Sequence, residues 1–184
     1  MTRYTWSRSL HDLGLSAWFG GTLANAVALN PAAAAASTGG DTGAVANVGW
    51  DRWTPVNAAA IGLHLVGSIG ILVGDKDRLT AQQGVASMAV AKTALTAAAL
   101  GVTAYSRALG RKVSEQTRVP AASGTEPTAQ TPKEVANAQR QLKALQWAVP
   151  ALTGAIVVVS AYAGEQQRAS EVKRGVLDRI NPLT

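Results

Sequence analysis

The chain has 184 residues, 47% of them hydrophobic and 15% charged, with a net charge of +6. This length predicts one domain, and the excess of hydrophobic over charged residues is typical of a membrane protein, although much of it is alanine. The absence of cysteine excludes disulfides, thiolate metal sites and cysteine nucleophiles. The basic residues cluster at the ends of apolar runs, which is unlike a nucleic-acid-binding stripe.

Four segments are apolar and long enough to cross the hydrocarbon layer of a bilayer, which takes a helix of about 20 residues. They cover residues 13–29, 56–74, 84–104 and 146–163. The sequence therefore predicts an all-α, multi-pass protein of the cell membrane, built as an antiparallel bundle of four transmembrane helices. The lipid bilayer is its first expected partner.

The first span has two interpretations. A charged start and the small-residue run "NPAAAAAST" are shared with cleaved signal peptides. Asn25 within the span and His11-Asp12 at its head favour a retained helix instead. A polar, glycine-rich link follows, and Trp50 and Trp53 stand where interfacial aromatic residues anchor a span.

The second and third spans are joined by the short turn "DKDR" at 75–78, so we expect them to pack as an antiparallel hairpin. The third span contains Lys92, which costs about 2.5 to 3.5 kcal/mol on the insertion scale. Segment 113–131, rich in Pro, Ser, Thr and Gly, is expected to be a flexible loop.

Thr131 to Glu134 match a capping box with proline at the first helical position, which predicts a helix from Pro132 to about Ala163. At 1.5 Å per residue this helix is about 48 Å long, so the fourth helix extends beyond the bilayer. Pro150 is expected to kink it, because proline cannot donate to the carbonyl of Gln146. The tail, 165–184, is mixed in charge and compatible with a short surface helix.

Each span carries its polar side chains on one face when residues are placed at 100° intervals. These side chains are His11, Trp18, Thr22 and Asn25, then Asn57, His64 and Ser68, then Lys92, Thr96 and Thr103, and finally Gln146, Thr153 and Ser160. Lipid offers them no hydrogen bonds, so they are expected to face one another inside the bundle. The predicted intramembrane polar site consists of Asn25, Asn57, His64, Lys92 and Thr96.

Gly67, Gly70 and Gly74 lie on a neighbouring face of the second span. Small residues allow membrane helices to approach closely, so these glycines are expected to mark a helix-packing surface.

His64 and Lys92 are expected at similar depths on consecutive helices. They form either a proton- or anion-responsive site, or a structural pair in which the histidine bonds a neighbouring helix and the lysine reaches toward the interface. His11 is expected at the membrane edge, away from His64, which disfavours a bis-histidine haem site. No nucleotide-binding, hydrolase or zinc-protease motif is present in the sequence. We therefore expect no enzyme activity, no metal and no cofactor.

The stretches "LHDLGLSAWFGG", "NVGWDRWTPVNAAAIGLHLVG" and "QRQLKALQWAVPALTGA" resemble an actinobacterial family of uncharacterised small four-helix integral membrane proteins. The resemblance implies a membrane location and assigns no catalytic residue.

Three functions stay open at this point. The first is a non-enzymatic accessory or assembly partner in the envelope, bound to other membrane proteins or to itself and not to nucleic acid. The second is a small ion- or proton-conducting or pH-sensing bundle that uses His64 and Lys92, and the third is a soluble, alanine-rich helical bundle. Orientation also stays open, because each side of a four-span chain collects eight Lys and Arg residues.

Overall fold

The computed structural model describes residues 4–116, 119–168, 172–173 and 176–177. The helices are α1 (Thr5–Ala24), the π-helical segment η1 (Asn25–Leu29), α2 (Asn30–Ala33), α3 (Gly39–Gly74), α4 (Lys76–Ala81), α5 (Val85–Ser114) and α6 (Lys133–Glu165). Two short antiparallel strands, β1 (Ala121–Ser123) and β2 (Glu126–Pro127), pair with each other. The prediction of a mostly helical, all-α chain is confirmed.

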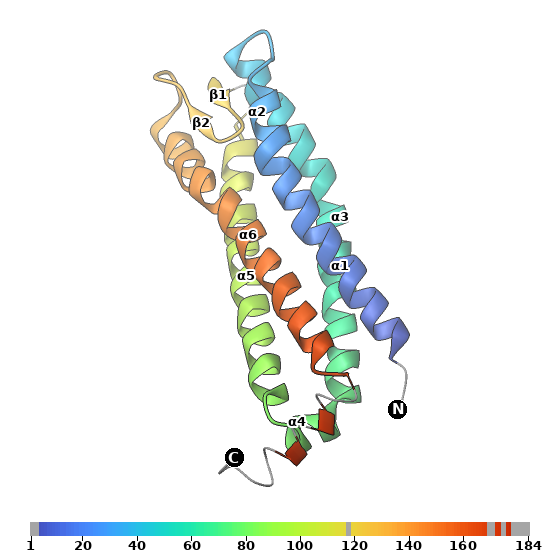
Figure 1. Ribbon diagram of the computed structural model, residues 1–184. Helices are drawn as coiled ribbons and strands as arrows, with labels where there is room; N and C mark the ends of the chain where they lie inside the picture. The colour runs from blue at the N-terminus through green and yellow to red at the C-terminus, as the bar shows by residue number, and fades with distance from the viewer. Residues whose placement is uncertain (1–3, 117–118, 169–171, 174–175, 178–184) are drawn as a thin grey trace.

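The long helices lie side by side in an elongated arrangement (Figure 1). The start of α1, the end of α6 and all of α4 lie at one end, which we call the α4 end. The strands, α2 and the start of α3 lie at the opposite end, which we call the strand end.

The pairing of the helices differs from the expected one. α1 packs along α3 and α5 packs along α6, whereas α3 and α5 contact each other little. The prediction that the second and third spans form a hairpin is therefore wrong, although only the short α4 separates them. α6 also contacts α1 and so joins the two pairs.

Glycines explain why α3 pairs with α1. A Cβ atom at Gly67 would lie 2.2 Å from the backbone nitrogen of His11, and one at Gly70 would lie 2.3 Å from the Ser7 hydroxyl oxygen. At Gly74 a Cβ would lie 2.4 Å from the ring of Tyr4. The three glycines thus let α3 approach α1 more closely than any larger residue permits.

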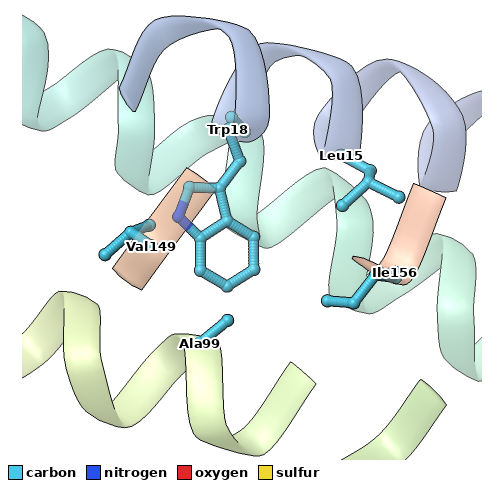
Figure 2. Close-up of a cluster of buried hydrophobic side chains, with 6 residues drawn as sticks. Leu15, Trp18, Ala99, Val149 and Ile156 are labelled. Atoms are coloured by element: carbon cyan, nitrogen blue, oxygen red, sulfur yellow. The ribbon is translucent and has the colours of Figure 1, made fainter. Parts of the chain in front are cut away.

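The apolar core lies where the two pairs meet (Figure 2). Leu15 and Trp18 of α1 pack there against Ala99 of α5 and against Val149 and Ile156 of α6. Trp18 and Ile156 are completely buried, as expected for Trp18. This cluster fixes α6 against α1 and α5.

Most of the remaining apolar surface is exposed. α3, α5 and α6 are long and apolar enough to cross a membrane, and fewer than a quarter of the residues in the most apolar stretch of each are buried. Large side chains such as Val66, Ile69 and Val90 are more than half exposed. The first predicted span, 13–29, is not among these three helices, since the structure divides it between α1 and η1.

The long helices extend beyond the predicted spans. The glycine-rich link ahead of residue 56 is helical from Gly39, where the Thr38 hydroxyl accepts a hydrogen bond from the backbone of Asp41 at 3.2 Å. At 36 residues, α3 is about 54 Å long, well beyond a hydrocarbon core of about 30 Å.

Segment 113–131, expected to be a flexible loop, instead contains the end of α5 and the strand pair, with residues 117–118 outside the described part. Ala121 and Thr125 are buried in it. The predicted capping box at Thr131 is wrong. The Thr131 hydroxyl accepts from the backbone of Thr128 at 2.8 Å and donates to the carbonyl of Pro120, and Pro132 caps α6 without a side-chain bond.

α6 nevertheless covers the predicted 132–163 helix and continues on both sides of the buried Pro150. The tail, 165–184, falls largely outside the described residues, of which 172–173 and 176–177 are helical.

Candidate functional site

Two cavities lie between α3 and α5. The first, of about 430 Å³, is nearer the α4 end, and the second, of about 320 Å³, is nearer the strand end. Leu100 of α5 lines both. The polar faces of the helices therefore meet around two separate spaces, whereas the sequence predicted one shared interior.

The first cavity combines charged groups with an apolar wall. Arg8, Arg78 and Lys92 supply three cationic groups, and Asp12 and Asp75 supply two anionic ones. The apolar wall includes Leu65, Ile69, Leu72, Met88 and Leu100. The cavity thus carries one more cationic than anionic side chain.

His11, which lines the first cavity, meets His64 there. Their ring centroids lie 4.6 Å apart at an interplanar angle of 47°, and both side chains are buried. The expectation that they lie at different depths is wrong. α1 starts at Thr5 and packs on the glycines of α3, so its second turn lies opposite His64 and Gly67, within the predicted second span.

Each histidine has one bonded and one unbonded ring nitrogen. His11 Nδ1 lies 2.7 Å from an Asp12 carboxylate oxygen, and His64 Nε2 lies 3.4 Å from the Thr96 hydroxyl. His11 Nε2 and His64 Nδ1 are buried and have no hydrogen-bond partner among the described residues. Leaving such a group without a partner costs about 1 to 3 kcal/mol, so packing alone does not account for this pair.

Lys92 lies on the opposite wall of the first cavity, in the second turn of α5. None of the ion pairs within the described ranges includes it. A lysine withdrawn from water normally has a carboxylate partner, because removing its charge from water is costly. Arg8 also has no ion pair among the described residues, but it donates to the side chain of Gln167. The half-buried Lys92 has neither an ion pair nor a hydrogen bond in the described part of the chain.

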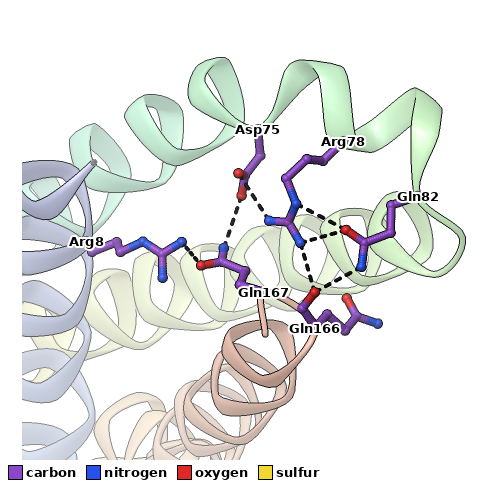
Figure 3. Close-up of polar contacts among 6 residues, drawn as sticks. All are labelled: Arg8, Asp75, Arg78, Gln82, Gln166 and Gln167. Atoms are coloured by element: carbon purple, nitrogen blue, oxygen red, sulfur yellow. Dashed lines mark hydrogen bonds and ion pairs between the residues drawn. The ribbon is translucent and has the colours of Figure 1, made fainter. Parts of the chain in front are cut away.

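A polar network forms the α4 end of the first cavity (Figure 3). Arg78 donates to Asp75 at 3.2 Å, to the side chain of Gln82 at 2.9 Å and to the carbonyl of Gln166 at 3.2 Å. Arg8 donates to the side chain of Gln167, which in turn donates to Asp75 at 3.4 Å. These bonds tie the start of α1 and the end of α6 to the α3–α4 turn.

Asn30 is the central hydrogen-bonding residue beside the second cavity. Its amide donates to the side chain of Gln146 at 2.8 Å, and its carboxamide oxygen accepts from Trp50 Nε1 at 3.0 Å. Its backbone carbonyl accepts from the N–H of Gly124 at 3.1 Å. Trp50, expected to be an interfacial anchor, thus helps to join α2, α3, α6 and the strands.

Comparison with protein-family models, with curated proteins and with solved structures gave no match. The resemblance to an actinobacterial membrane-protein family stays a prediction. Within the described ranges, no group of three or more His, Cys, Asp or Glu side chains is placed to hold a metal ion.

The structure separates the five residues of the predicted polar site. Lys92 and Thr96 line the first cavity, and His64 contacts it through Thr96. Asn57 lines the second cavity, and Asn25 is buried in η1, outside both.

Sequence reasoning missed the end network and Asn30. The network residues lie far apart in the chain, and only the spacing of Asp75, Arg78 and Gln82 along one helical face indicated a local contact.

Proposed function

We propose that the protein is an integral membrane protein of the cell envelope in which α1, with η1 and α2, joins α3, α5 and α6 as a fourth transmembrane helix. The exposed apolar side chains of α3, α5 and α6 support this, because contact with lipid would remove them from water. The helices are longer than the hydrocarbon layer is thick, so the strand end would project from it.

Within this bundle, the first cavity serves as an ion-responsive site, in a small conducting or pH-sensing protein. The observation that carries this proposal is the buried His11–His64 pair beside a cavity that also contains Lys92. Ionisable groups inside a membrane are costly, and where they occur they usually mark an ion or proton path. Histidine is suited to this role because it changes charge near neutral pH.

The relation of the two cavities agrees with a path along the bundle. They follow each other along α5 and share Leu100. A large apolar side chain between two cavities that each contain polar groups can act as a hydrophobic constriction. Leu100 is therefore the residue at which we expect passage to be controlled.

Flux through proteoliposomes tests this function. Purified protein would be reconstituted with a pH-sensitive dye inside the vesicles, and flux measured after a pH step. We expect His64→Ala and Lys92→Met to abolish a flux that Lys112→Met leaves unchanged, since Lys112 is an exposed residue of α5 that lines neither cavity. Equal flux in empty vesicles and in vesicles with the wild-type protein would contradict the proposal.

A second candidate is a non-enzymatic accessory or assembly partner that binds other membrane proteins or a second copy of itself. The observation that favours it is the unpaired side of α3 and α5, which leaves large apolar side chains such as Val73 and Val90 exposed. Purification in mild detergent tests it. A stable partner retained by both wild-type and Lys92→Met protein, without flux, would favour this role over conduction.

A further inference from the structure

We infer that the first cavity binds an apolar monocarboxylate, that is, a carboxylate on a hydrocarbon chain, and that Lys92 is its counter-charge. This inference rests on the proposed function in one respect: it names the class of anion that the ion-responsive site recognises.

The charges in the cavity favour an anion. Asp75 forms an ion pair with Arg78 at 3.2 Å. Asp12 is hydrogen-bonded to His11 at 2.7 Å, and its side chain is 69% exposed, at the rim of the cavity. Arg8 and Arg78 donate to groups of the end network, so Lys92 is the cation left without a partner in the described part of the chain. An unneutralised cation in surroundings of low dielectric attracts anions and repels cations.

The remaining wall favours a hydrocarbon chain over a small inorganic anion. Leu65, Ile69, Leu72 and Met88 line the cavity beside Lys92. Its volume of about 430 Å³ falls within the range of pockets that bind small organic molecules. A halide would neutralise the lysine but leave these apolar side chains without contact.

A second hydrogen-bond donor lines the same cavity as Lys92. Ser160 of α6 lines the same space, and its buried hydroxyl has no partner among the described residues. A carboxylate has two oxygens that each accept hydrogen bonds. The Ser160 hydroxyl is therefore a further donor for a carboxylate bound in this cavity.

The depth of Lys92 in the membrane favours a free fatty acid over a phospholipid as the bound anion. Lys92 lies eight residues beyond Gly84, about 12 Å along the helix. A phospholipid phosphate stays in the headgroup layer, outside the hydrocarbon core. A free acid can instead enter from the bilayer in its protonated, uncharged form. It then releases the proton to water, and its carboxylate pairs with the Lys92 ammonium.

Photo-crosslinking in nanodiscs of neutral lipid tests the inference. The probe is a sixteen-carbon fatty acid with a diazirine in its chain, and cross-linked peptides are located by mass spectrometry. We expect cross-links at the half-buried residues of the cavity wall, Leu65, Met88 and Leu100. We expect at least a tenfold loss of these cross-links in Lys92→Met, and retention in Lys92→Arg and Lys112→Met.

Two further probes separate the sources of the anion. A diazirine fatty alcohol of the same length should label the wall at least tenfold less than the acid, and a diazirine phosphatidylglycerol should label only exposed helix faces. Equal labelling by acid and alcohol, or labelling of the wall by the phospholipid, would overturn the inference. So would full retention of the cross-links in Lys92→Met.

The crosslinking experiment and the flux experiment test separate claims, so one claim can be wrong while the other holds. Lys92-dependent crosslinking without flux would support the binding site and contradict the conducting role. Flux that depends on Lys92, without any acid crosslinking, would leave the conducting role standing and overturn the ligand assignment. Circular dichroism and thermal unfolding of each variant show whether it has folded.

Discussion

Gly67 of α3 packs directly on the backbone of His11 of α1, where a Cβ atom would lie 2.2 Å from the His11 nitrogen. His64 stands one helical turn before Gly67, so this contact also brings the two imidazoles together. The packing of the α1–α3 pair and the geometry of the histidine pair thus have a common cause.

Gly67→Val is expected to destabilise the protein and to separate the histidines. The added side chain would meet backbone atoms, which cannot move aside as the end of a flexible side chain can. Overpacking of this kind typically costs about 1 to 3 kcal/mol. Thermal unfolding in detergent, followed by circular dichroism, measures the loss.

Gly62→Val is the matched control for this prediction. Gly62 lies on the same helix, and a Cβ atom there would meet nothing within 4 Å. An equal loss of stability in both variants would show that the effect comes from helix composition and not from the contact with His11.

Lys92→Met is expected to stabilise the protein while it abolishes the ion-responsive site. Lys92 is partly buried and makes no ion pair in the ranges that the structure describes, so its removal breaks no such pair. Apolar replacements of buried ionic groups are often stabilising, by about 1 to 4 kcal/mol. The melting temperature in detergent should rise, with Lys112→Met unchanged. A fall would mean that Lys92 has an anionic partner in the folded protein.

Asn30→Ala is expected to loosen the strand end. The substitution removes both side-chain bonds of Asn30 and leaves Trp50 and Gln146 without these partners. An unpaired buried donor or acceptor costs about 1 to 3 kcal/mol, so the total loss should be about 2 kcal/mol or more. Asn137→Ala, at an exposed residue that bonds only its neighbours Arg140 and Gln141, is the control. Unfolding by denaturant in mild detergent compares the two, and equal stability would contradict this role for Asn30.

The sequence predicted well what depends on local spacing. The 100° periodicity placed Lys92 and Thr96 together on α5, and both line the first cavity. It also placed Asn57, Thr103 and Gln146 on the inward faces of their own helices, and these three line the second cavity. α6 was predicted to within two residues at each end, because an apolar helix after a proline is a local pattern.

The sequence did not show which helices pair. The short turn at 75–78 favoured the packing of α3 against α5. The close contacts of Gly67, Gly70 and Gly74 with α1 decide the pairing instead. The contact between His11 and His64 could not be predicted either, because it depends on the position of α1 along the axis of α3. The prediction of a capping box was wrong because the Thr131 hydroxyl donates to the carbonyl of Pro120, just before β1, and not to the start of α6.

Labelling of single cysteines tests most directly whether lipid surrounds this bundle, and the native lack of cysteine leaves no background. Cysteines would replace Ser37 at the strand end, Thr80 in α4, and the exposed Val66 and Val158 within the predicted spans 56–74 and 146–163. We expect a membrane-impermeant maleimide to label Ser37→Cys and Thr80→Cys from opposite sides of sealed vesicles and to leave Val66→Cys and Val158→Cys unlabelled. Labelling of Val66→Cys in intact vesicles, or of Ser37→Cys and Thr80→Cys from one side only, would contradict the membrane bundle and the cavity functions proposed for it.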